Sequence, residues 1–208
     1  MWTLPIVAIH CGGGAPFHEM TTDKWRRVTT VNLDAVFWTF REAAKHMIAR
    51  GEGGKIINMA SQAGRRGEGL VAVYCASKAA VHALSDALRM ELKPFGVDVI
   101  TVQPGGIRSA FGERAAAQVR AVLPEHSRYA AVADSIIARA QDSQGGAMEA
   151  DEFARRMLDQ VLATKAPHTV RIGKGSFTLP FFKRYAPVRL RDQHLMKRYA
   201  LEQLGLRP

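Results

Sequence analysis

Four short apolar runs rich in β-branched residues alternate along the chain with long segments of helical periodicity. The runs cover residues 3–9, 55–60, 97–102 and 168–172. Between and after them, apolar side chains recur every three or four positions over residues 23–48, 73–95 and 150–164. Strands that alternate with long helices are typical of a parallel sheet joined by right-handed crossovers. The alternation therefore predicts an α/β fold, with a loop and broken helices over residues 107–148.

Residues at the expected helix boundaries support this pattern. Thr21 or Thr22 can cap a helix that begins near Asp23, and the glycines within residues 51–54 end it. Gly96 is placed to end the helix over residues 73–95.

Three polar or glycine-rich stretches directly follow predicted strands. They are residues 12–14, Ser61 and residues 104–109. In parallel sheets, ligands bind in the crevice outside the carboxyl ends of the strands. We therefore expect these three stretches to line one crevice.

Tyr74 and Lys78 stand four positions apart at the start of a predicted helix, so they share one helix face. A free phenol has a pKa near about 10 and is a poor base at neutral pH. A nearby ammonium favours the phenolate and lowers that pKa, which suits a tyrosine to proton transfer. By itself the spacing is weak evidence, because such pairs also occur on solvated helix faces.

Two further polar residues belong to this context. Ser61 ends the preceding strand, where its hydroxyl can hydrogen-bond a substrate carbonyl while Tyr74 exchanges a proton. Asn32 places an amide on an otherwise apolar helix face, and a buried amide needs a partner. It is either a satisfied core amide or part of a relay towards Lys78.

Four segments resemble, in order and spacing, successive motifs of the short-chain dehydrogenase/reductase family. They are Val31-Asn-Leu33, Ile56-Ile-Asn-Met-Ala-Ser61, Tyr74-Cys-Ala-Ser-Lys78 and Val102-Gln-Pro-Gly-Gly-Ile107. The resemblance covers residues 4–172 and implies a partial Rossmann-like, doubly wound parallel sheet that holds only the C-terminal strands. The family's first β-α-β-α-β portion has no counterpart here, so we expect an N-terminally truncated copy.

The resemblance implies a role for each matching residue. Tyr74 would be the general acid/base, and Lys78 would lower its pKa and bind the nicotinamide ribose. Ser61 would polarise the substrate carbonyl, and Asn32 would hold a water that links Lys78 to solvent. The implied reaction is hydride transfer between NAD or NADP and a ketone or secondary alcohol.

Contacts with the cofactor are implied for a second set of residues besides Tyr74 and Lys78. The backbone at Pro104, Gly105 and Ile107 and the hydroxyl of Ser109 would contact the nicotinamide carboxamide.

Two departures from the family pattern bear on cofactor binding. Where the family has Asn-Asn-Ala-Gly, this chain has Ile9-His10-Cys11-Gly12, and we interpret His10 as an ordinary loop histidine. No glycine-rich turn for a pyrophosphate precedes a helix, so we expect the chain as given to bind NAD(P)H weakly. The residue that would separate NAD from NADP is missing with that turn. The alternative function is a non-catalytic relic or interaction module that does not bind the cofactor.

We divide the chain into a catalytic part, residues 1–172, and a basic, amphipathic C-terminal extension, residues 173–208. The net charge is +10, and residues 165–208 hold ten Lys or Arg against Asp192 and Glu202. We interpret these charges either as a solvated cover or as a contact with an anionic membrane surface or a lipid-like substrate. Nucleic-acid binding is not expected, because no recognition motif is present.

The remaining expectations concern partners and location. The substrate would be a small, hydrophobic carbonyl or alcohol compound. An exposed edge strand over residues 3–9 would favour a homo-oligomer. Cys11 and Cys75 lack metal or redox spacing, so no metal is expected. No secretory leader is found, and no apolar run approaches the roughly 20 residues of a spanning helix. We therefore expect a cytoplasmic protein, attached at most to a membrane surface.

Overall fold

The four predicted strands form one parallel sheet in this computed structural model, which describes residues 6–7, 14–65, 67–110, 113–114, 116–117, 123, 126–141 and 144–205. The strands are β1 (Ile6–Val7), β2 (Gly54–Met59), β3 (Val97–Pro104) and β4 (Thr169–Ile172). They lie in the order β1-β2-β3-β4, and every neighbouring pair is parallel. Of the first predicted strand, residues 3–5 and 8–9 lie outside the described residues, as do His10 and Cys11.

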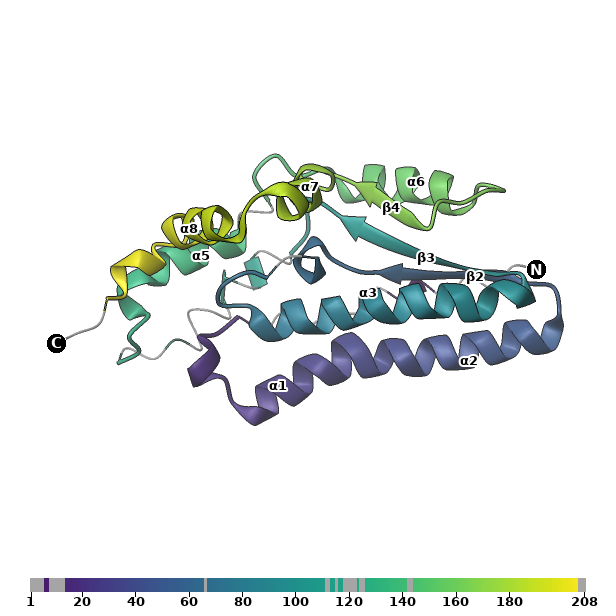
Figure 1. Ribbon diagram of the computed structural model, residues 1–208, viewed down its shortest axis with the longest axis horizontal. Coiled ribbons are helices and arrows are strands. Elements are labelled where there is room, and N and C mark those ends of the chain that lie inside the picture. The colour runs from purple at the N-terminus through teal and green to yellow at the C-terminus, as the bar shows by residue number, and fades with distance from the viewer. Residues whose placement is uncertain are drawn as a thin grey trace.

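One face of the sheet is covered by α1 (Thr22–Thr29), α2 (Ala35–Arg50) and α3 (Ala72–Leu92), as Figure 1 shows. Thr21 caps α1, because its hydroxyl oxygen accepts a hydrogen bond from Lys24 N at 3.2 Å. Gly51 ends α2 with a φ of 71°, a left-handed conformation that glycine adopts without strain. The predicted boundaries of these helices are therefore confirmed at Thr21 and Gly51.

The helix predicted over residues 23–48 contains an interruption that its periodicity did not reveal. Residues Thr30–Asp34 form a π-helical segment between α1 and α2. Such segments insert one extra residue into a helix and are frequent at functional sites. Asn32 lies in this segment, with its side chain buried, rather than in regular α-helix.

The opposite face of the sheet is covered by α6 (Ala150–Val161). Neighbouring strand residues point to opposite faces, so Ile56 and Val99 pack towards α2 and α3 while Ile57 and Ile100 pack towards α6. All four side chains are buried, which is expected of a parallel sheet with helices on both faces. The predicted doubly wound α/β architecture is confirmed.

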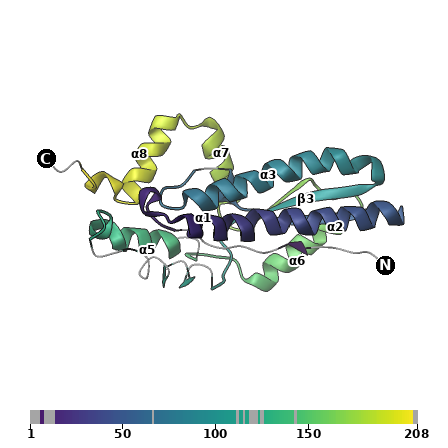
Figure 2. The ribbon, with the colours of Figure 1, turned by 90° about the horizontal axis from the view of Figure 1, so that it is seen from below.

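Beyond the carboxyl ends of the strands lie α5 (Ala133–Gln141), α7 (Thr178–Tyr185) and α8 (Val188–Arg198). Short 3₁₀ turns connect or flank the helices: Phe17–Glu19, Gln62–Gly64, Lys93–Phe95, Ala130–Val132 and Leu201–Gln203. In Figure 2, α7 and α8 extend to the side of the molecule opposite α5. Among the described helices, none combines the length and apolar character needed to cross a membrane.

Candidate active site

Tyr74 and Lys78 occupy the first two turns of α3, which begins at the carboxyl edge of the sheet (Figure 1). Tyr74 is partly buried, and Lys78 is only 2% exposed. The Lys78 ammonium donates a hydrogen bond to the carbonyl oxygen of Met59, at the end of β2, at 3.2 Å. Burial lowers the pKa of Lys78 from its usual 10.5 to about 8. The side chain is therefore still mainly cationic at neutral pH, although it lies inside the protein.

Ser61 follows β2 and is held against α3 by a tight turn. Its hydroxyl oxygen accepts a hydrogen bond from Ala63 N at 3.1 Å and so caps the turn Gln62–Gly64. A Cβ on Gly64 would lie 2.5 Å from the backbone carbon of Lys78, so only glycine allows the turn to approach α3 this closely. This contact places Ser61 beside the helix that carries Tyr74 and Lys78.

Asn32 is linked to α3 through a chain of hydrogen bonds. Its amide nitrogen donates to the Ser77 hydroxyl oxygen at 3.1 Å, and the Ser77 hydroxyl donates to the carbonyl oxygen of Tyr74 at 2.8 Å. Asn32 and Ser77 are both buried. The amide is thus partnered within the core, and the relay from Asn32 to Lys78 stays a prediction.

The stretch from Pro104 to Ser109 follows β3 and packs against the turn after β4. Gly105 N donates to the carbonyl oxygen of Ile172 at 2.7 Å, and a Cβ on Gly105 would overlap the carbonyl oxygen of Lys174. Further along, the Gln144 side chain accepts from Ser109 N at 3.1 Å and donates to the carbonyl oxygen of Ile107 at 3.3 Å. The predicted cofactor-contact residues therefore lie at the carboxyl edge, in a backbone fixed from two sides. The predicted crevice also included residues 12–14, of which only Gly14 is described.

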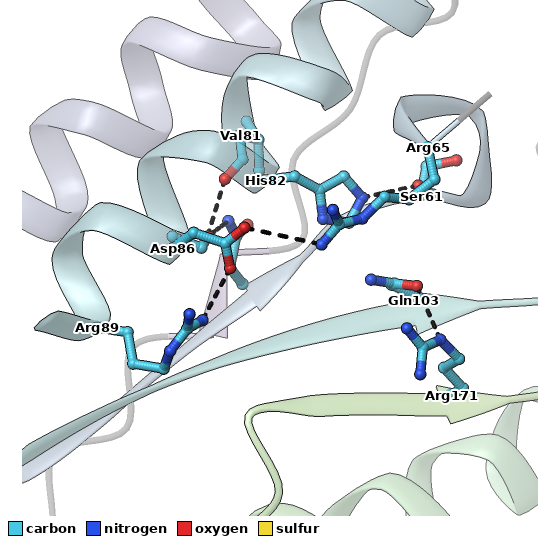
Figure 3. Close-up of polar contacts among 10 residues, drawn as sticks. Ser61, Arg65, Val81, His82, Asp86, Arg89, Gln103 and Arg171 are labelled. Atoms are coloured by element: carbon cyan, nitrogen blue, oxygen red, sulfur yellow. Dashed lines mark hydrogen bonds and ion pairs between the residues drawn. The ribbon is translucent and has the colours of Figure 1, made fainter. Parts of the chain in front are cut away.

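His82 belongs to this site, and the sequence analysis assigned it no role. Its Nε2 lies 3.0 Å from the carbonyl oxygen of Ser61, and the ring is buried (Figure 3). Because a carbonyl only accepts hydrogen bonds, this contact requires the proton on Nε2. Burial is the main cause that lowers the pKa of His82 below 6.5, so the ring is neutral at physiological pH. The position could have been noticed, since His82 follows Lys78 by four residues and Tyr74 by eight on one helix face.

An ion-pair network lies next to His82 on the surface of α3. The Asp86 carboxylate forms ion pairs with the guanidinium groups of Arg89, at 2.8 Å, and of Arg65, at 3.9 Å (Figure 3). Arg65 belongs to the turn that follows Ser61. The pairs are partly exposed, so each contributes little stability by itself. Their position nevertheless links the Ser61 turn to α3 a second time.

A buried polar group joins the ends of β3 and β4 to the Ser61 turn, and it too was missed. Gln62 donates to the carbonyl oxygens of Gln103 at 3.3 Å and Ser176 at 3.1 Å. Arg171 Nε donates to Gln103 Oε1 at 3.1 Å (Figure 3). Glutamine and arginine in strands and turns carry no periodic signal, so only the fold reveals that these side chains meet.

The described part of the chain contains neither a pair of cysteines nor a cluster of metal-ligating side chains. Cys75 is buried on α3, and Cys11 lies outside the described residues. Within the described ranges, no three His, Cys, Asp or Glu side chains gather in a way that could hold a metal ion.

Known proteins resemble this chain in sequence and in fold. The profile of the family described as short chain dehydrogenase matches residues 6–120. A sorbitol dehydrogenase from Cereibacter sphaeroides is 47% identical over 91 residues, which cover 44% of this chain and 36% of that protein. The matched segment thus spans about a third of the length of that relative.

Solved structures extend the comparison to the whole chain. A short-chain dehydrogenase from Streptomyces avermitilis superposes on 98% of this chain and 71% of its own, with a TM-score of 0.71 and 19% identity. At that identity the likeness concerns the fold. A 4-hydroxyisoleucine dehydrogenase mutant complexed with NADH and succinate matches 56% of this chain and 51% of its own, with a TM-score of 0.52 and 28% identity.

Proposed function

The chain belongs to the short-chain dehydrogenase family, and on that premise we propose that it carries the proton-transfer site of an oxidoreductase. The reaction is hydride transfer between NAD(P)H and a ketone or secondary alcohol. One observation carries the proposal: a buried, mainly cationic Lys78 lies in the first turns of α3, one helical turn after Tyr74 and against the Ser61 turn.

Tyr74 is the group that gives or takes the proton at the substrate oxygen. A free phenol is too weak an acid and too weak a base near neutral pH, because its pKa lies near about 10. The Lys78 ammonium favours the phenolate through its positive charge, and its buried position strengthens that effect. The pair thereby brings the phenol closer to the pH at which it must work.

Ser61 orients the substrate carbonyl for this transfer. Its oxygen already accepts a hydrogen bond from Ala63 N, which fixes the side chain in one direction. A hydroxyl that accepts in this way keeps its own proton for donation. Ser61 therefore donates to the same substrate oxygen that Tyr74 protonates, and it stabilises negative charge that develops there.

The residues present fit the nicotinamide end of the cofactor. An ammonium donates three hydrogen bonds, and Met59 O accepts one of them, so Lys78 can also bind the hydroxyls of a ribose. The rigid backbone at Pro104, Gly105 and Ile107 and the hydroxyl of Ser109 would hold the carboxamide. When bound, the nicotinamide supplies or accepts the hydride. We propose NAD or NADP as the cofactor, and assays with each of the two distinguish them.

The proposal includes a hydrophobic substrate, because apolar side chains are exposed on the helices that follow the site. Self-association and contact with a membrane surface, both expected from the sequence, stay predictions. The alternative of a non-catalytic relic is not favoured, since Asn32, Ser61, Tyr74 and Lys78 are all retained at one edge of the sheet.

The experiment that tests the proposal compares three purified forms of the chain: wild type, Tyr74→Phe and Tyr185→Phe. Each is assayed with NADH and NADPH against a panel of hydrophobic ketones. We expect Tyr74→Phe to lower the rate by about 10² to 10⁴-fold, as loss of a general acid does. Tyr185 is exposed on α7, so its variant is the matched control.

Turnover that Tyr74→Phe leaves unchanged would remove Tyr74 from the mechanism. A wild-type chain that neither binds a nicotinamide cofactor nor turns over any substrate would favour the relic instead.

A further inference from the structure

The helices α7 and α8 form a hairpin. The residues that flank it are buried, whereas the two helices themselves are not. Ser176, just before it, is 1% exposed, and its carbonyl oxygen accepts from Gln62. Tyr199, just after it, is 3% exposed, and Leu201 and Leu204 pack onto an apolar cluster with Leu70. No residue of α7 or α8 itself is buried. The hairpin is therefore held in place while both of its helices face outwards (Figure 2).

Three aromatic side chains form a stripe along the hairpin. Phe177, Phe181 and Tyr185 follow one another at intervals of four residues, which places them on one helix face. They are 66%, 66% and 65% exposed, and the rings of Phe181 and Tyr185 lie 4.6 Å apart. Val188 and Leu190, at the start of α8, are also mostly exposed. Large apolar side chains exposed together on one helix face are typical of an interaction surface.

The same hairpin is strongly basic. Residues 177–198 hold six Lys or Arg, and their one acidic residue is Asp192. The basic residues are Lys183, Arg184, Arg189, Arg191, Lys197 and Arg198. Arg184 lies with its guanidinium carbon 5.9 Å from the centre of the Tyr185 ring. Positive charge is thus placed directly beside the exposed rings.

From this combination we infer that the α7–α8 hairpin docks on the surface of a membrane that contains anionic lipids. Helices that lie in a membrane interface combine an apolar face with Lys and Arg that meet lipid phosphates. Tyrosine is enriched at the depth of the headgroups, and phenylalanine is common on the apolar face of interfacial helices. The helices are too short to span a bilayer, so the hairpin would lie on the surface.

The basic charge decides between a membrane and a second copy of this chain. An interface between two copies would bring the same six positive side chains together, and like charges oppose such a contact. Anionic headgroups neutralise them instead. This docking does not depend on the proposed hydride chemistry, and it is tested without an activity assay.

The test is co-sedimentation of the purified chain with phosphatidylcholine vesicles and with vesicles that also contain phosphatidylserine. We expect binding to the mixed vesicles that weakens as salt is added, because the attraction is electrostatic. The combined variant Phe177→Ser, Phe181→Ser, Tyr185→Ser and the combined variant Lys183→Glu, Arg184→Glu, Arg189→Glu should each reduce this binding at least about tenfold.

The matched control replaces an exposed aromatic pair on α2, Phe37→Ser with Trp38→Ser, which also lies beside a cation, Arg41. Binding should be unchanged in this control. Thermal melting should be nearly unchanged in the two hairpin variants, because the replaced side chains are exposed.

Two results would overturn the inference. The first is no binding of wild type to the mixed vesicles; if wild type is then a dimer in sedimentation velocity that the aromatic variant splits, the stripe belongs to a second copy. The second is an equal loss of binding in the α2 control.

Discussion

The start of α3 and the α7–α8 hairpin depart from the usual rule of burial in opposite directions. Around α3, polar side chains are buried: Lys78, Asn32, Ser77 and His82 are all at most 3% exposed. In the hairpin, the rings of Phe177, Phe181 and Tyr185 are exposed to about two-thirds of their surface. Polar groups are ordinarily outside and large apolar groups inside, so each departure costs free energy.

The two regions differ in where the partners of these side chains lie. The buried polar groups around α3 find hydrogen-bond partners within the protein: Lys78 at Met59, His82 at Ser61 and Asn32 at Ser77. In the hairpin, the rings of Phe181 and Tyr185 contact each other, but most of the surface of the stripe residues is exposed to solvent. We therefore expect changes near α3 to alter stability and chemistry, and changes in the hairpin to alter binding alone.

The largest expected difference in the free energy of unfolding is between the variants Phe40→Ala and Phe181→Ala. Phe40 is 1% exposed in the cluster between α2 and the sheet, and Phe40→Ala should lower the free energy of unfolding by about 3–5 kcal/mol. Phe181→Ala removes a ring that is mostly exposed, and we expect a change within about 0.5 kcal/mol. Urea denaturation of both variants measures these changes. Equal losses would mean that the hairpin packs as a core element.

The pH dependence of stability should distinguish Lys78 from Lys183. Folding lowers the pKa of Lys78 from 10.5 to about 8, so the unfolded chain holds this proton between those two values and the folded chain does not. The cost of burying the cation, on the order of 3 kcal/mol, is thus fully present below pH 8 and vanishes as pH rises towards 10.5.

Lys78→Met lacks this dependence, so its stability relative to wild type should fall as pH rises from 8 to 10. Melting temperatures of wild type and Lys78→Met, measured from pH 8 to pH 10, test this expectation. Lys183, exposed on α7, is the matched control, and Lys183→Met should track wild type at every pH. A constant difference between Lys78→Met and wild type would refute the lowered pKa.

The tight contact between the Ser61 turn and α3 should make Gly64 intolerant of any side chain. Gly64→Ala places a Cβ against the backbone of Lys78 and Ala79, and we expect a loss of about 1–3 kcal/mol. Gly67, three residues later, has open space around its Cβ position, so Gly67→Ala should be nearly neutral. Denaturation curves of the two variants compare them, and similar values would show that the turn is free to move.

A comparable effect is expected at His82, compared with His194 on α8. His82→Ala leaves the carbonyl oxygen of Ser61 without this donor, at a cost of about 1–3 kcal/mol. His82→Gln keeps an N–H at similar reach and should recover part of the loss. His194 is exposed near the Phe182 ring, and His194→Ala should change little. No recovery in His82→Gln would argue that ring packing, rather than the hydrogen bond, is what matters.

His82 should also make the stability of the protein depend on pH. Because burial lowers its pKa, the stability from the neutral ring is complete above about pH 6.5 and declines as pH falls below that value. The stability difference between wild type and His82→Gln should narrow on acidification.

The strands, the long helices and their caps were predictable from the sequence because they depend on short-range patterns. Residues 55–60 and 97–102 coincide closely with β2 and β3, and Thr21 caps α1 as expected. The π-helical segment around Asn32 was not predictable, since one extra residue in a helix turn barely disturbs the apolar periodicity. The site residues were found from their motif spacing, and their roles stay predictions.

The α/β architecture and the candidate pair Tyr74 and Lys78 could be predicted from the sequence, because both depend on patterns that repeat every two to four residues. The tertiary structure alone decided that His82 meets Ser61 and that Gln62 joins β3 to the hairpin, across separations of up to 114 residues. It also decided that the aromatic stripe faces outwards. Such contacts depend on how strands and helices pack, and local propensities carry no information about that packing.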